Sequence, residues 1–241
     1  MIGTIINAAG IGVGCLAGLT RRGQISPARQ NLLKAGLVLG CYLTGGRLLW
    51  NHVNGSFGSC LAQVGVALLA LILGRLLGRL LHLQKLSNRL GQLARARFER
   101  AGQPGFSRFN DGFLACAILY SVSPLAILGS LQDGLQGNWH LLALKSVMDG
   151  LAAVAFASAF GAGALLALVP VVAWQGFLTL GAQWLGHSWL AAPQLAASFH
   201  VTTGLFMFSV GLVILEVEKV ELADYLPALA VAPLLARWWL V

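Results

Sequence analysis

Long apolar runs separated by short polar or basic stretches recur along nearly the whole chain. A helix that crosses the hydrocarbon core of a bilayer needs about 20 mostly apolar residues. Seven runs fit that template, so the pattern predicts an all-α fold, a polytopic membrane helix bundle with about seven transmembrane helices. The expected spans are residues 2–19, 35–50, 59–81, 112–132, 141–160, 164–186 and 199–215.

Two further segments are expected at the membrane surface. Residues 225–241 are short for a span, contain Pro227 and Pro233, and end with Arg237 beside two tryptophans. We expect this segment to be interfacial or re-entrant on the cytoplasmic side; an eighth span is the alternative. Residues 82–108 are basic and partly amphipathic, which favours a helix lying on the anionic inner leaflet of the membrane.

The composition supports an integral membrane protein, because 57% of residues are hydrophobic, 10% are charged and the mean hydropathy is +0.77. These values lie far outside the range of soluble proteins. The formal charge of +8 comes from basic residues between apolar runs, a distribution that reflects membrane topology rather than binding of nucleic acid. The first run lacks a basic stretch before it, so we expect a retained span and not a cleaved signal peptide.

The positions of lysine and arginine predict how the spans are oriented. Positively charged loops stay in the cytoplasm, and the alternate loops "NHVNGSFGS", "GLQGNWHL" and "GHSWLAAPQ" contain neither residue. We therefore expect the N-terminus outside and the C-terminus in the cytoplasm. The loops after the first and third spans hold Arg21, Arg22, Arg29 and Lys34, and then Lys85, Arg89, Arg95, Arg97, Arg100 and Arg108.

Weak similarities between the two halves of the chain predict an internal repeat. "NAAGIGVGCLAG" resembles "DGLAAVAFASAFG", "GLVLG" resembles "GFLTLG" and "LHLQKLSNRL" resembles "LEVEKVELADYL", in the same order and at an offset near 140 residues. We expect a three-one-three arrangement: residues 1–91 as one three-helix repeat, 109–135 as a linker helix and 141–229 as the second repeat. Parallel repeats of this kind occur in transporters, an analogy of fold that does not establish transport.

One stretch, "LKSVMDG", places two charges inside a predicted span. Lys145 and Asp149 are four residues apart and so share one face of a helix. An unpaired charge at mid-membrane costs roughly 3 kcal/mol on insertion scales, so the pair is expected to face protein or water and not lipid. It is either a neutralised structural pair that fixes the register of the helix, or a site in which Asp149 is titratable or binds an ion.

Further polar residues are candidates for the same site. Asp133, Gln132 and Arg47 are expected at the same outer level of the bundle as Lys145. Ser130 lies in the stretch "ILGSLQDGL", which also contains Gln132 and Asp133. Pro124 removes a helical hydrogen bond in its span, so Ser123 beside it either repairs the break or leaves a carbonyl for a ligand. Asn7 and Gln175 are buried polar candidates whose alternative role is to hold helices together.

The sequence contains two glycine pairs with the spacing of a membrane helix-packing motif and lacks common catalytic motifs. Gly14 with Gly18 and Gly74 with Gly78 have GxxxG spacing, which permits close helix approach within the chain or, alternatively, in a homodimer. The sequence contains no GxSxG or HExxH motif, and its histidines are scattered, so we expect no enzyme activity. The four cysteines lie in apolar runs without CxxC pairing, so we expect neither a metal site nor a cofactor.

Six motifs in order resemble those of the domain of unknown function 554 family of bacterial inner-membrane proteins: "GTIIN", "ILGSLQDGL", "KSVMDG", "FASAFGAG", "WQG" and "LP". The resemblance covers nearly the whole chain. The stretch from Ser123 to Ile127 departs from the usual pattern of the family, which affects the expected geometry of the fourth span. The resemblance implies a protein of the bacterial cytoplasmic membrane and no particular substrate.

The leading functional hypothesis is a transporter or channel for a small solute or ion. It rests on the polar candidates at membrane depth, the predicted helix breaks and the predicted repeat. The alternative is a membrane scaffold or regulatory partner that does not transport and whose polar pairs are structural. The expected partners are therefore a small solute or ion and the anionic inner leaflet of the bilayer.

Overall fold

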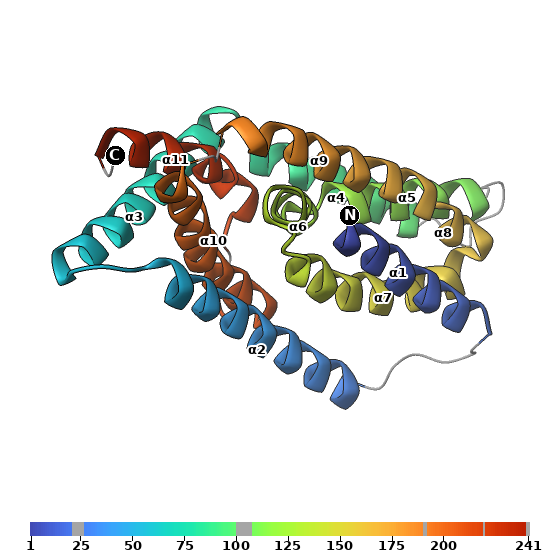
Figure 1. The fold of residues 1–241 in the computed structure, drawn as a ribbon. Coiled ribbons are helices and arrows are strands. Elements are labelled where there is room, and N and C mark those ends of the chain that lie inside the picture. Colours follow the sequence, from blue (N-terminus) through green and yellow to red (C-terminus); the bar gives the residue numbers. More distant parts are fainter. Residues whose placement is uncertain (21–26, 100–107, 190–191, 219, 240–241) are drawn as a thin grey trace. The chain divides into compact units, whose positions relative to one another are not determined.

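The computed structural model describes residues 1–20, 27–99, 108–189, 192–218 and 220–239, and the regular secondary structure of this part of the chain is entirely helical (Figure 1). The predicted all-α class is therefore confirmed. In chain order the elements are α1 (Ile2–Thr20), α2 (Pro27–His52), α3 (Phe57–Leu80), α4 (Leu83–Glu99), α5 (Arg108–Val122), α6 (Pro124–Gln136), α7 (His140–Phe160), α8 (Ala162–Leu166), α9 (Leu168–Trp189), α10 (Pro193–Ile214), the 3-10 helix η1 (Leu222–Tyr225) and α11 (Ala228–Trp239).

Among the described residues, five helical stretches are long and apolar enough to cross a membrane: α1, α3, α7, α10 and residues 162–184 of α8 and α9. Helices α5 and α6 form a bent pair that raises the number to six if the pair is one span. The remaining predicted span, residues 35–50, lies inside α2, whose side chains are described only in part, and it stays a prediction. The 12 residues of α11 extend only about 18 Å, too short for the eighth span that was the alternative.

The chain forms two compact units, residues 1–26 with 85–185 (unit 1) and residues 27–84 with 186–241 (unit 2). Unit 1 holds α1, most of α4, the helices α5 to α8 and nearly all of α9. Unit 2 holds α2, α3, α10, η1 and α11. Helix α4 lies within the predicted surface segment 82–108 and forms most of its described part. Residues 100–107 of that segment lie outside the described part.

In unit 1, α1 packs along α7 through a stripe of glycines (Figure 1). A methyl group added at Gly10, Gly14 or Gly18 would overlap Ser146, the Gly150 carbonyl oxygen or the Val154 carbonyl oxygen, respectively. Each step of four residues on α1 is matched by a step of four on α7, so the two helices run parallel. Gly14 and Gly18 thus use their GxxxG spacing for packing inside the chain, as small residues allow in membrane helices.

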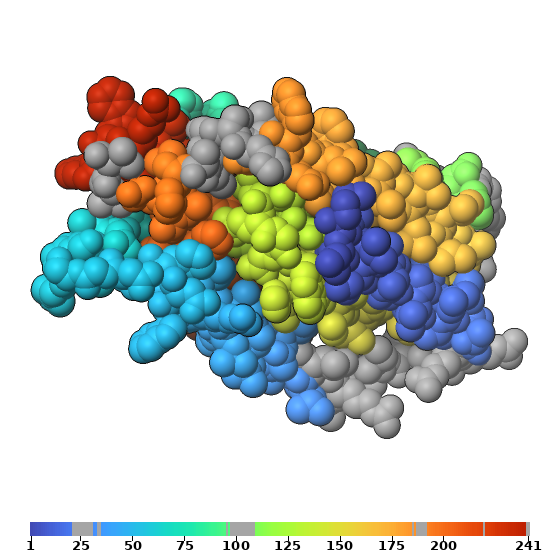
Figure 2. Space-filling view, viewed as in Figure 1, coloured from blue at the N-terminus to red at the C-terminus, as the bar shows by residue number. Residues whose placement is uncertain are grey.

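The face of α1 opposite this seam is apolar and exposed, with Ile5, Val13 and Leu16 each more than half accessible, as expected for side chains that contact lipid. Figure 2 shows α1 and α9 side by side on this face of unit 1, the former dark blue and the latter orange. Thr4 and Thr179 link the two helices through their hydroxyl groups, 3.4 Å apart.

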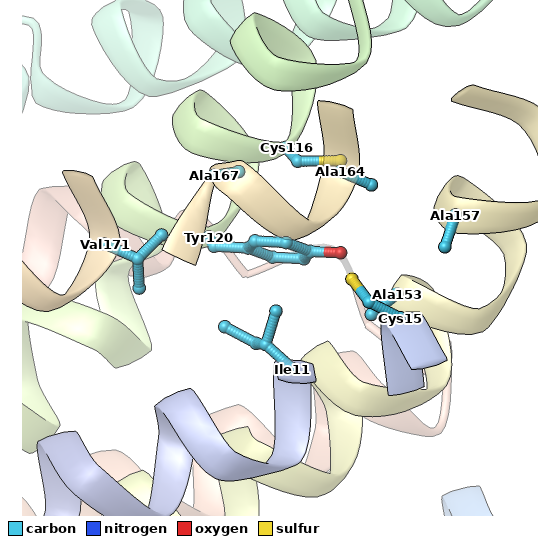
Figure 3. Close-up of a cluster of buried hydrophobic side chains, with 9 residues drawn as sticks. All are labelled: Ile11, Cys15, Cys116, Tyr120, Ala153, Ala157, Ala164, Ala167 and Val171. Atoms are coloured by element: carbon cyan, nitrogen blue, oxygen red, sulfur yellow. The ribbon is translucent and has the colours of Figure 1, made fainter. Parts of the chain in front are cut away.

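The apolar core of unit 1 surrounds Tyr120 on α5 (Figure 3). Small side chains make this packing close, since a large aromatic ring is accommodated only where its neighbours leave room. Cys15 and Cys116 belong to the core as free thiols. The cluster consists of Ile11, Cys15, Cys116, Tyr120, Ala153, Ala157, Ala164, Ala167 and Val171.

The predicted break at Pro124 is present. Helix α5 ends at Val122, α6 begins at Pro124, and the two axes differ by 56°. Proline has no N–H and its ring displaces the preceding turn, so a new helix begins there, and the Ser123 carbonyl accepts from the N–H groups of Ala126 and Ile127 at 2.8 and 3.3 Å. The bend directs α6 into the unit, where it contacts α1 and α7.

Unit 2 contains the second glycine pair. A methyl group at Gly74 would overlap Ala228, and one at Gly78 would overlap the Asp224 carbonyl oxygen, so α3 packs closely on η1 and the start of α11. The Arg79 guanidinium binds the Glu221 carboxylate at 3.1 Å at the same junction. Both glycine pairs therefore pack against the chain's own helices.

Candidate functional site

Buried polar side chains are concentrated in unit 1, around the first half of α1. Of the fifteen buried polar or charged side chains among the described residues, ten lie on the four helices that meet there. Because an isolated polar group is costly in an apolar interior, such a concentration marks the candidate site. Its members are Thr4 and Asn7 on α1, Ser130, Gln132 and Asp133 on α6, Lys145, Ser146 and Asp149 on α7, and Gln175 and Thr179 on α9.

The charged pair of α7 is formed as predicted. The Lys145 ammonium donates to Asp149 Oδ2 within the same helix, one turn away. Only 2% of the Lys145 side chain is exposed, against 12% of the Asp149 side chain. Both charges are thus buried by the protein, and the carboxylate is the more accessible of the two.

Asn7 and Gln175 join this pair from two other helices. The Asn7 Nδ2 atom donates to Asp149 Oδ2 and to Gln175 Oε1, both at 3.3 Å. The network therefore links α1, α7 and α9 through one carboxylate and two amides. Ser146 extends the contact between α1 and α7 by donating to the Ile6 carbonyl oxygen at 2.8 Å.

Several polar atoms of the site lack a hydrogen-bond partner within the described part of the chain. They are Asn7 Oδ1, Gln175 Nε2, the Ser130 hydroxyl and both amide atoms of Gln132. Buried polar atoms are nearly always satisfied in folded proteins, and an exception calls for a water molecule, an ion or a ligand. The free oxygen of Asn7 and the free N–H groups of Gln175 belong to the same network as the ion pair, so they are the strongest sign of a ligand.

Asp133 lies in the same unit and contacts the start of α1. Its Oδ2 atom accepts from the Gly3 backbone N–H at 3.0 Å and from the Met1 ammonium at 2.9 Å. A carboxylate at this position stabilises the positive end of the α1 helix dipole. The structure therefore assigns Asp133 to positioning α1 beside the site.

The remaining predicted residues differ in their surroundings. Gln132 and Ser130 are fully buried on α6, whereas Ser123 is half-buried at the break before that helix. Arg47 is exposed and belongs to α2 in unit 2, and its place beside the site stays a prediction.

Thr4, Ser146 and Thr179 were not among the sequence candidates. Ser146 lies inside the "KSVMDG" motif, and Thr4 and Thr179 each precede or follow a candidate by about one turn, Asn7 and Gln175 respectively. Periodicity along a helix face could have found them.

The ten side chains of the site offer carboxylate, amide and hydroxyl oxygens together with one ammonium, a set suited to a small polar or charged ligand. The described residues contain no cluster of three or more His, Cys, Asp or Glu side chains that could hold a metal ion.

Comparison with known proteins finds a matching family and similar proteins from two bacteria. The pattern of the family described as "Protein of unknown function (DUF554)" matches residues 2–237. The chain is 26% identical over 233 residues to "Uncharacterized membrane protein YdfK" of Bacillus subtilis (strain 168), covering 97% of this chain and 94% of that protein. It is 28% identical over 185 residues to "Uncharacterized protein YqgA" of Escherichia coli (strain K12), covering 73% and 75%. No solved structure matches.

Proposed function

Because the chain belongs to the DUF554 family of proteins of unknown function, whose description assigns no activity, we propose a function from the site of unit 1: transport of a small polar solute or ion across the membrane. The observation that carries this proposal is the buried network of Lys145, Asp149, Asn7 and Gln175, in which polar atoms of both amides have no partner among the described residues. Polar residues inside a membrane helix bundle commonly mark the path of a substrate.

The bent pair of α5 and α6 supports the same proposal. Discontinuous helices line the binding sites of many transporters, because the break exposes backbone groups and allows one half of the helix to move. Here the second half, α6, carries Ser130 and Gln132 with their unpartnered polar atoms. A movement of α6 about the Ser123–Pro124 break would change the surroundings of these groups.

The alternative function is that of a scaffold without transport activity, in which the polar network would have only a structural role. In a scaffold, Lys145 and Asp149 would only hold α7 in place, and a buried pair is not by itself strong evidence for either role. The unpartnered amide atoms of Asn7 and Gln175 favour a ligand, since a purely structural network gains nothing from unsatisfied groups.

The test begins by finding a ligand for the purified full-length chain. A ligand that binds the folded state raises its apparent stability, so a thermal-shift screen over inorganic ions, amino acids and sugars identifies compounds for flux measurements in proteoliposomes. We expect at least one compound to stabilise the protein and to be transported. Asp149→Asn should retain the helical circular dichroism spectrum and lose flux by about tenfold or more, a loss equivalent to about 1.4 kcal/mol.

Asp224→Asn is the matched control, because Asp224 is an equally buried carboxylate in unit 2 that accepts from the Gln84 backbone N–H at 2.8 Å. It should keep its flux. Flux of Asp149→Asn equal to that of the parent protein would refute the proposed site, and the absence of any stabilising or transported compound would favour the scaffold.

A further inference from the structure

Three helices of unit 1 bring one carboxylate and two side-chain amides together. Asp149 on α7 is linked by Asn7 Nδ2 to Gln175 Oε1, with both hydrogen bonds at 3.3 Å. The Asn7 Oδ1 atom is fully buried and has no partner among the described residues. Since Oδ1 and Nδ2 are bonded to the same carbon, rotation of the amide would place this oxygen between Asp149 and Gln175. Carboxylate and amide oxygens are the ligands that hard cations prefer.

The Lys145 ammonium now neutralises this carboxylate. It is tethered to the same helix, donates to Asp149 Oδ2 and is nearly inaccessible to solvent. The Lys145 ammonium and a bound cation cannot both bind the same oxygen of the Asp149 carboxylate, because like charges repel strongly in a medium of low dielectric constant. Occupancy of the site by a cation would therefore require Lys145 to move away from Asp149.

We infer that Asp149, Asn7 and Gln175 form a binding site for a hard monovalent cation, for which the Lys145 ammonium is an intramolecular substitute. This inference rests on the proposed function and names the ligand class of the same site. A single carboxylate balances one positive charge, whereas sites for divalent cations such as Ca²⁺ combine several negatively charged ligands. Exchange of the ammonium for the cation would then couple ion binding to a rearrangement of α7 against α1 and α9.

The experiment uses the purified full-length chain and sodium as the probe. Thermal unfolding is followed by tryptophan fluorescence while sodium chloride replaces choline chloride at constant ionic strength and constant pH. We expect the melting temperature of the parent protein to rise with sodium in a saturable manner. The dependence should disappear in Asp149→Asn, weaken in Asn7→Ala and Gln175→Ala, and persist in the control Asp224→Asn.

Lys145→Gln separates this account from a merely structural ion pair. Removing the internal competitor should lower the sodium concentration at half-effect by about tenfold or more, which corresponds to at least 1.4 kcal/mol of competition. A structural pair predicts a variant that is equally destabilised in sodium and in choline. If Lys145→Gln does not fold, the comparison of the parent protein with Asp149→Asn decides the question alone.

Two outcomes overturn the inference: no difference between sodium and choline for the parent protein, or a sodium effect that survives in Asp149→Asn. Stabilisation by acidification without any sodium effect also overturns it and assigns the proton as the ligand of Asp149. Flux of another solute without sodium dependence leaves the proposed function standing while this inference fails. Sodium binding without any flux refutes the transport proposal instead.

Discussion

The ion pair of α7 permits a quantitative prediction by a double-mutant cycle. Lys145→Met and Asp149→Leu each remove one charge and leave the other buried, a change that costs about 3–5 kcal/mol when a buried pair is broken. The two substitutions should lower the free energy of unfolding by unequal amounts. After Lys145→Met the carboxylate keeps the Asn7 amide at 3.3 Å and its greater exposure, 12% against 2%, so we expect Asp149→Leu to be the more destabilising substitution.

The double variant should be far more stable than the sum of the single effects predicts. Replacing both charges with apolar side chains of similar volume removes the desolvation penalty, and such replacements are often neutral. We therefore expect a coupling free energy of about 3 kcal/mol or more. The measurement is reversible unfolding in mixed detergent micelles with increasing sodium-free dodecyl sulfate, followed by far-ultraviolet circular dichroism with choline as the buffer cation. Additive effects of the two substitutions would refute the reasoning, because they would mean that the charges do not interact.

Three further predictions concern packing and helix capping. Gly14→Ala should destabilise the protein by about 1–3 kcal/mol, as overpacking does, whereas Gly12→Ala on the same helix meets a neighbour only at 3.7 Å and should be neutral in the same unfolding assay. Gly78→Ala should be destabilising by a similar amount, while Gly65→Ala, which has no atom within 4 Å, should leave the unfolding midpoint unchanged. Asp133→Asn removes the negative charge beside the N-terminal end of α1 and should destabilise the first turn of this helix by about 0.3–2 kcal/mol. The loss should appear as faster amide hydrogen exchange in that turn, and unchanged exchange would contradict the capping role of Asp133.

The helices and their apolar faces could be predicted because the hydrophobic effect acts on runs of residues that are visible in the sequence. The break at Pro124 was predictable for a similar reason, since a missing N–H is a local property.

The site was predicted in part. Lys145 and Asp149 were paired correctly because their spacing of four residues fixes their contact on any helix. The partners of Asp133 could not be foreseen, since residues 130 positions apart in the chain meet only through tertiary packing. The grouping of Arg47 with the site rests on its expected depth in the membrane and stays a prediction, because Arg47 belongs to unit 2.

The most direct test of the central claim is whether water-soluble reagents reach the polar cluster of unit 1 in the membrane. Ser130 and Ala153 are both fully buried, the first with an unpartnered hydroxyl and the second in the apolar core around Tyr120. Each is replaced by cysteine in a chain whose native cysteines have been changed to alanine. We predict that a small charged methanethiosulfonate labels Ser130→Cys in native membranes and leaves Ala153→Cys unmodified, although both react after denaturation. Equal protection of the two positions would contradict the account, because the cluster would then be a dry structural seam.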